Sequence, residues 1–255
     1  APAMSLATGV ATIVSRTARI SAMAAATVAE RSGGRMILGL GTGHAGRGAL
    51  SELRTYVGIV RALLEGRSVE GEQLSLVPGQ PVPIWTAALG PRSMALAGEI
   101  ADGVLLNWCP PERVAFARER IAEGAERAGR DAASVEVGVY VRASVGQGEA
   151  AKVALRRAAR EYASYPAYRR QFDEVGLGKE AEAAANAAPD GAGVPDALLD
   201  AVTLRGDAPG ALGRLQAYRE AGADVPIVYP VATLEPVSSV LGTLFALAPV
   251  PAVED

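Results

Sequence analysis

Short apolar runs alternate along this chain with longer segments of helical periodicity, and this alternation constrains the fold more than any other feature. It predicts strand–helix units and a parallel sheet. The run 36–40, Met-Ile-Leu-Gly-Leu, is uniformly apolar, as strands covered on both faces are. We predict strands at about residues 6–14, 36–41, 83–88, 103–107, 135–145 and 225–230. Six strands leave two architectures open, an open sheet and a parallel barrel, and a closed barrel of this type needs eight.

Helices are predicted in the intervals between these strands. The clearest covers about residues 50–65, where Leu53, Val57, Val60 and Leu64 recur at spacings of three and four and so share one face. Ser15 is the predicted N-cap of an earlier helix that stops at the glycine pair after Ser32. Another helix is expected to begin at Pro91, and others at about residues 110–129, 208–221 and 235–247. We predict one domain over residues 1–255, with a mainly helical insertion at about 149–207.

Composition excludes several classes of protein. The 255 residues carry a net charge of -3, and Lys and Arg are spread among Glu residues without a basic stripe, which argues against a nucleic-acid partner. No apolar run approaches the roughly 20 residues of a membrane span. Cys109 is the single cysteine, so no intramolecular disulfide forms and a cytoplasmic location is expected. We expect Cys109 to be a small buried hydrophobe and predict no metal site.

The loop Gly41-Thr42-Gly43-His44-Ala45-Gly46 fits the pattern G-x-G-x-x-G, directly after a predicted strand and before a helix. In a dinucleotide-binding protein, such glycines let the backbone approach a pyrophosphate at a helix N-terminus. That interpretation also requires an acidic residue at the end of the following strand, and none stands at the expected distance. The motif alone is weak, so we disfavour a dinucleotide site.

Two other segments combine small residues with a strand. Residues 87–93, Ala-Ala-Leu-Gly-Pro-Arg-Ser, lead from a strand into a helix whose free amides and dipole would attract an anion. The same residues suit a tight turn with Pro91 at the first helical position. In residues 8–12, Gly9 marks either a bulge or a close approach of backbone to a ligand. The residues by themselves leave both questions open.

Several motifs, taken in order, resemble one family. The segments that carry the resemblance are residues 7–10 (ATGV), 32–44 (SGGRMILGLGTGH), 53–66, 83–91, 101–103 (ADG) and 128–131 (AGRD). Together they resemble the luciferase-like monooxygenase superfamily, and most closely its branch that uses the deazaflavin coenzyme F420, with FMN enzymes as near relatives. The resemblance is good over about residues 4–145 and moderate at 222–226.

This resemblance implies an α/β fold, a TIM-type (β/α)8 barrel with its active site at the carboxyl ends of the strands. The family has two further strand–helix units before the region that Ala1 matches, and this sequence lacks their counterparts. The family also carries a non-proline cis peptide in its third strand, a position that Gly9–Val10 matches. Thr12 and Thr42 match cofactor contacts, and residues 89–93 match a phosphate-binding turn. The cofactor-binding residues that we predict are Gly9, Val10, Thr12, Thr42, Gly43, Ala88, Leu89, Gly90, Pro91, Arg92 and Ser93.

His44, the only histidine, matches an acid/base residue of the sugar-phosphate dehydrogenases of this family, so we predict that it transfers a proton. A structural or solvent-exposed histidine is the alternative. Trp108 and Cys109 follow a strand end and either line a substrate pocket, which the insertion covers, or pack in the core.

The predicted activity is hydride transfer between F420 and a small organic substrate. The alternatives are an FMN-dependent monooxygenase on the same scaffold and a non-catalytic, shortened flavin-binding barrel. The family also implies a homodimer.

Overall fold

A computed structural model describes residues 4–43, 46–146 and 148–248 of the chain. The contacts within it define two compact units. Unit 1 comprises Ala1–Leu105 and Ala117–Val137, and unit 2 comprises Leu106–Phe116 and Gly138–Asp255. Each unit is described by itself.

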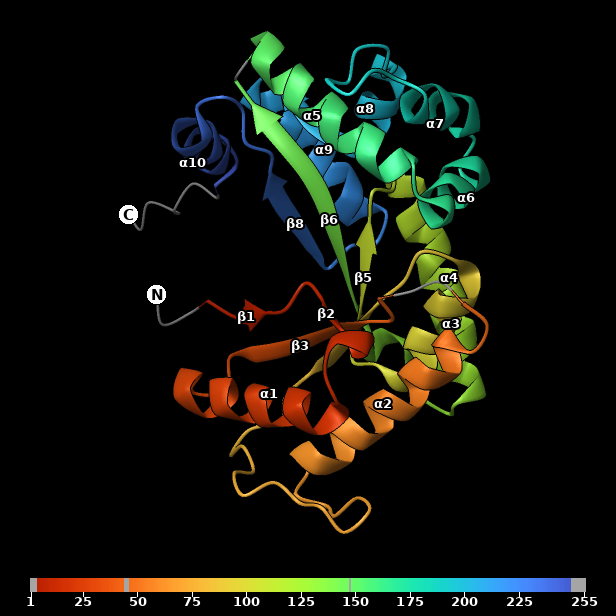
Figure 1. Cartoon of the computed structure of the whole chain (residues 1–255), viewed down its shortest axis with the longest axis vertical. Helices are drawn as coiled ribbons and strands as arrows, with labels where there is room; N and C mark the ends of the chain where they lie inside the picture. Colours follow the sequence, from red (N-terminus) through yellow and green to blue (C-terminus); the bar gives the residue numbers. More distant parts are fainter. Residues whose placement is uncertain (1–3, 44–45, 147, 249–255) are drawn as a thin grey trace. The chain divides into compact units, whose positions relative to one another are not determined.

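The strands of unit 1 are parallel and are arranged around β3 (Met36–Gly41). β1 (Leu6–Ala7) and β2 (Ala11–Thr12) pair with β3 on one side (Figure 1). β4 (Ile84–Ala87) pairs with β3 on the other side. The first residues of β5 (Gly103–Asn107) pair in turn with β4. The predictions at 36–41, 83–88 and 103–107 are therefore confirmed.

The continuous strand predicted at 6–14 is wrong. The hydroxyl of Thr8 accepts from the amide of Gly39 (2.9 Å) and donates to the Gly39 carbonyl (2.8 Å), so a side chain replaces the backbone ladder at this point. β1 and β2 are consequently two short pieces, and the chain continues as the 3-10 helix η1 (Ile13–Ser15).

The helices of unit 1 cover the strands. α1 (Ala18–Ser32) and α2 (Ala49–Leu64) pack their apolar faces into one core cluster that includes Leu53, Val57 and Val60. α3 (Pro91–Ile100) and residues 117–127 of α4 (Pro111–Arg127) complete the unit. α1 ends at Gly33 (φ 68°) as predicted, but its N-cap is Thr17, whose hydroxyl accepts from the Ile20 amide. Ser15, which we predicted as the cap, instead donates to the Thr12 carbonyl.

Unit 2 is built on β6 (Glu136–Val145), with which β7 (Thr203–Gly206) and β8 (Val225–Pro230) pair in parallel. Between β6 and β7 lie α5 (Gly148–Ala163), α6 (Pro166–Glu174), α7 (Gly178–Ala185) and α8 (Asp196–Val202). α9 (Ala208–Glu220) follows β7, and α10 (Pro236–Leu247) follows β8. The segment 149–207 is thus mainly helical. We did not predict β7, because a strand of four residues is too short to show a clear alternation of apolar and polar side chains.

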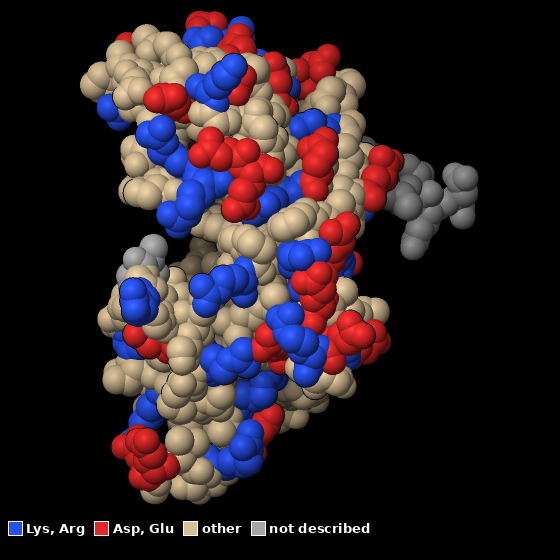
Figure 2. Space-filling model, turned by 90° about the vertical axis from the view of Figure 1, so that its right-hand side faces the viewer, with Lys and Arg blue, Asp and Glu red and all other residues tan. Residues whose placement is uncertain are grey.

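Charged side chains of both signs are mixed on the face of the protein that Figure 2 shows, which agrees with the absence of a basic stripe in the sequence. Among the residues that the structure describes, no helix combines the length and the apolarity that crossing a membrane requires.

We expect Gly124→Ala to destabilise the protein by about 2 kcal/mol, because overpacking a tight contact outweighs the gain in helix propensity. A Cβ at Gly124 in α4 would lie 1.8 Å from the Ala95 carbonyl oxygen of α3. Gly58→Ala is the matched control, since a Cβ at this position in α2 meets nothing within 4 Å. Gly58→Ala should stabilise by about 0.5–1 kcal/mol. Urea unfolding measures both, and a Gly124→Ala variant as stable as wild type would contradict the helix contact.

Candidate functional site

The carboxyl ends of β2, β3 and β4 lie next to one another in unit 1. Thr12 pairs with Gly41, and Leu40 pairs with Thr86, so the last residues of these strands form one edge of the sheet. The peptide bond Gly9–Val10, just before β2, is cis, as the family resemblance predicts. The structure therefore brings Gly9, Val10 and Thr12 to the same edge as Gly41 and the following Thr42.

Close contacts at this edge require glycine at two positions. A Cβ at Gly41 would lie 2.7 Å from Cγ2 of Val10, so the Val10 side chain fills the space directly over β3. Gly43 has a φ of 72°, and its Cβ would lie 2.8 Å from both Thr12 Cβ and Val14 Cγ2. The loop after β3 consequently packs onto the chain at β2, and Thr12 and Gly43 are neighbours in space.

The segment 88–93 forms the entrance to α3. The Ser93 hydroxyl accepts from the amides of Leu89 (3.3 Å) and Gly90 (3.2 Å) and donates to the Gly90 carbonyl (2.8 Å). The sequence suggested free amides throughout 89–93, and at Leu89 and Gly90 this is wrong, because Ser93 caps them. A Cβ at Gly90 meets nothing within 4 Å, so space is open in front of the first turn.

Other residues of this segment differ in exposure. Ala88 is buried, whereas Pro91 and Arg92 are exposed. Pro91 and Arg92 line an outer groove with residues of α2 and α4, among them Arg54 and Glu123. His44 lies outside the described residues.

Unit 2 contains a polar cluster that the sequence interpretation missed. Arg142 of β6 is 6% exposed and donates to Asn107 Oδ1 (2.6 Å) and to the Tyr162 hydroxyl (3.1 Å). Asn107 Nδ2 in turn donates to the Tyr168 hydroxyl (2.7 Å). The one available signal was an arginine well inside the mostly apolar strand 136–145, where a charge needs an explanation.

Trp108 and Cys109 are both buried in unit 2. Trp108 packs against Tyr162, with ring centroids 5.1 Å apart. Burial raises the pKa of the Cys109 thiol to about 12, with Arg113 opposing the rise. Burial likewise raises the pKa of the Tyr168 phenol to about 12, against the opposing effect of its hydrogen bond with Asn107.

Strand–helix alternation and parallel strands define the class, an α/β protein with small residues gathered at the carboxyl ends of its strands. Residues 2–225 match the luciferase-like monooxygenase family, and the chain belongs to this family.

Among curated proteins, the chain is similar to 5,10-methylenetetrahydromethanopterin reductase of Methanolobus tindarius, with 35% identity over 153 residues, 53% of this chain and 47% of that protein. It is also similar to a putative coenzyme F420-dependent oxidoreductase of Mycobacterium tuberculosis, with 32% identity over 156 residues, 49% of this chain and 45% of that protein. The chain thus spans about half the length of the curated relatives it matches.

Solved structures show the same fold. An F420-dependent secondary alcohol dehydrogenase in complex with an F420–acetone adduct superposes with a TM-score of 0.76 at 18% identity, covering 98% of this chain and 80% of that one. The oxygenating constituent of 3,6-diketocamphane monooxygenase of Pseudomonas putida, in complex with FMN, superposes with a TM-score of 0.66 at 17% identity. The match covers 95% of this chain and 77% of that one. These likenesses confirm the predicted fold class, the TIM-barrel type of the luciferase-like family.

Cys109 should resist thiol reagents in the folded protein. With a pKa of about 12 and 1% exposure, almost none of the thiol is ionised or accessible at pH 8. Labelling with a chromogenic disulfide reagent at pH 8 is expected to be slow in buffer. In guanidinium it should be immediate and reach one thiol per chain, because Cys109 is the single cysteine. Rapid stoichiometric labelling of the native protein would contradict the burial of Cys109.

Proposed function

We propose that this protein is an F420-dependent oxidoreductase that transfers a hydride between the deazaflavin and a small organic substrate. The observation that carries the proposal is the edge at which the carboxyl ends of β2, β3 and β4 meet, with Val10 over Gly41, in a chain of the luciferase-like family. The names of two similar proteins, the mycobacterial oxidoreductase and the secondary alcohol dehydrogenase, support F420 as the cofactor.

The residues at this edge fit a flat ring system. Val10 projects over Gly41, and Gly41 pairs with Thr12, so small or β-branched side chains form the surface that a ring would contact. Thr86 of β4 contributes a buried hydroxyl that has no hydrogen-bond partner in the structure. When bound, F420 supplies the hydride donor or acceptor, while Gly9, Val10, Thr12, Thr42 and Gly43 would support its ring and keep water from one side.

The entrance to α3 would hold the cofactor phosphate. Gly90 leaves open space in front of the helix, and the first turn presents amides and the positive end of the helix dipole. The Ser93 hydroxyl, which accepts from the amides of Leu89 and Gly90 and donates to the Gly90 carbonyl, would hold this turn in the shape that binds the phosphate. Ala88 and Pro91 would shape the turn, and Arg92 would contribute positive charge from the exposed side.

We also propose that His44 moves the proton that accompanies hydride transfer, because it directly follows Gly43 in the sequence. His44→Asn should lower kcat/KM by about 100-fold and remove one limb of its pH profile, because the variant loses the imidazole that would transfer the proton. F420 affinity, measured on the same variant, should stay within about twofold of wild type, since binding depends on other residues. An unchanged pH profile would assign the proton to another group.

An FMN-dependent monooxygenase is the second candidate, favoured by the fold shared with the FMN complex of the diketocamphane enzyme. Fluorescence titrations with F420 and with FMN separate the two. Micromolar binding of F420 supports the proposal, and binding of FMN alone with oxygen consumption supports the monooxygenase. Binding of neither would overturn both and favour a non-catalytic barrel.

The Gly90 position supplies a matched pair of variants for the phosphate site. Gly90 has a φ of -103°, which any residue adopts, and its Cβ position is open, so Gly90→Ala should bind F420 as wild type does. Gly90→Asp places a carboxylate where the phosphate would lie, and we expect at least a tenfold weaker affinity, about 1.4 kcal/mol. Equal affinities for the two variants would place the phosphate elsewhere.

A further inference from the structure

Arg142 of β6 is a buried cation in unit 2 that has only neutral hydrogen-bond acceptors around it. Its side chain reaches Asn107 Oδ1 and the Tyr162 hydroxyl. In the part of the chain that the structure describes, no carboxylate lies within ion-pair distance of Arg142. Removing a charge from water costs several kcal/mol, and a charge partner normally offsets this cost.

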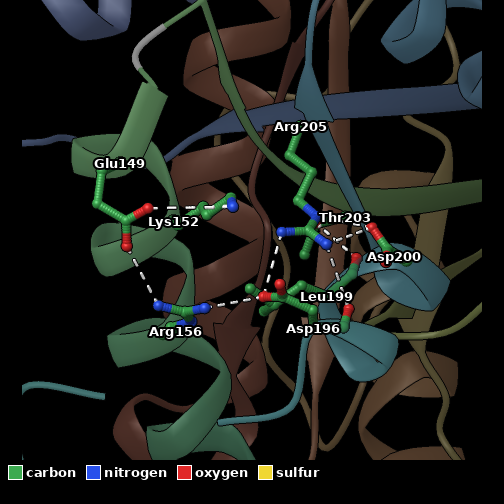
Figure 3. Close-up of polar contacts among 8 residues, drawn as sticks. All are labelled: Glu149, Lys152, Arg156, Asp196, Leu199, Asp200, Thr203 and Arg205. Carbon is green, nitrogen blue, oxygen red and sulfur yellow. Dashed lines mark hydrogen bonds and ion pairs between the residues drawn. The ribbon is translucent and has the colours of Figure 1, made fainter. Parts of the chain in front are cut away.

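Three other arginines of unit 2 have such partners. Arg113, which is 3% exposed, pairs with Glu174 at 2.5 Å. Figure 3 shows Arg205 between Asp196 and Asp200, and Arg156 between Glu149 and Asp196. The environment of Arg142 therefore differs from that of these arginines by a missing negative charge.

Aromatic rings cover the guanidinium of Arg142. Its Cζ lies 4.2 Å from the ring centroid of Tyr229 and 5.1 Å from those of Trp108 and Tyr162. Cation–π contacts contribute roughly 0.5–2 kcal/mol each and offset only part of the desolvation cost. They do not use the N–H groups of the guanidinium, which remain available for hydrogen bonds in its plane.

Donors outnumber acceptors around Arg142. A guanidinium has five N–H groups, and the two bonds named above use two of them. Trp108 Nε1 is buried without a hydrogen-bond partner in the structure. Because Asn107 donates to the Tyr168 hydroxyl, the phenolic proton of Tyr168 is available to an acceptor. A ligand rich in acceptor oxygens would satisfy all three groups.

The backbone beneath these donors is held in an unusual conformation. Trp108 has a φ of 52°, in the left-handed region that bulky residues rarely adopt and that occurs preferentially at functional sites. Gln171 of α6, itself 1% exposed, donates to the carbonyls of Asn107 (3.0 Å) and Trp108 (2.8 Å). The helical segment after β6 thus fixes the position of the tryptophan beside Arg142.

From these observations we propose that unit 2 contains an anion-binding site centred on Arg142, which takes the carboxylate or phosphate group of the substrate. Trp108, Tyr162 and Tyr168 complete the site. The assignment of the anion to the substrate rests on the proposed oxidoreductase function. Assigning the anion to the substrate narrows the substrate class to organic acids or phosphate esters. Simple neutral alcohols are then excluded as substrates.

The test uses Trp108 as the reporter, since Trp85 is the only other tryptophan. In a Trp85→Phe background, tryptophan fluorescence is followed while inorganic phosphate or benzoate replaces chloride at constant ionic strength. We expect a saturable change that Arg142→Gln weakens at least tenfold and Arg142→Lys several-fold, because lysine keeps the charge but loses the planar fork. Arg205→Gln, which changes an arginine already paired with carboxylates, is the control and should leave the response unchanged.

The proposed anion site would be overturned if neither phosphate nor benzoate gave a saturable change in tryptophan fluorescence. It would also be overturned if the Arg142 variants responded as strongly as the protein with Arg142. Arg142→Lys provides the comparison if the glutamine variant does not fold. F420 titration of the Arg142 variants identifies the source of the anion. Unchanged F420 affinity in these variants supports the proposal that the anion belongs to the substrate. A tenfold loss of F420 affinity would indicate that Arg142 binds the cofactor phosphate, and it would overturn our proposal. If the wild-type protein binds phosphate at Arg142 but does not bind F420, the anion site stands and the proposed F420-dependent function is overturned.

Discussion

Parallel pairing on both sides of β3 is the constraint on which the candidate site of unit 1 depends. Because the strands run in the same direction, their carboxyl ends meet at one edge, and the loops that follow them become neighbours in space. The contact of the Thr8 hydroxyl with both backbone groups of Gly39 keeps the chain against β3 where the ladder is interrupted. Val10 is thereby placed over Gly41, and Thr12 beside Gly43.

Unit 2 depends on a different kind of interaction, between strand-end residues and the helical segment that follows β6. Asn107 is the last residue of β5, yet its hydrogen-bond partners include Tyr168 and Gln171 of α6. Arg142 likewise reaches Tyr162 of α5. The helices after β6 therefore do more than cover a surface, since they supply the side chains that orient a buried cation.

Much of the fold could be predicted because each signal was local. The apolar runs at 36–41 and 103–107 became strands at those positions, and the three-four spacing of Leu53, Val57 and Val60 placed their side chains in the core. The Gly9–Val10 cis peptide was expected from the resemblance to the luciferase-like family, which several motifs along the chain carry together. The errors arose where a distant group intervened, as when the Thr8 hydroxyl bonded to Gly39 and divided the first strand.

The sequence alone determined the family, the strand–helix order and the segments that reach the carboxyl ends of the strands, since motifs and periodicities along the chain encode these features. It did not determine that Ser93 caps the amides of Leu89 and Gly90, or that Arg92 faces an outer groove. Nor did it reveal the environment of Arg142, whose partners lie 20 and 35 residues away. Only the tertiary structure decides these features, because hydrogen bonding and desolvation depend on which groups are close in space, irrespective of their separation in the chain.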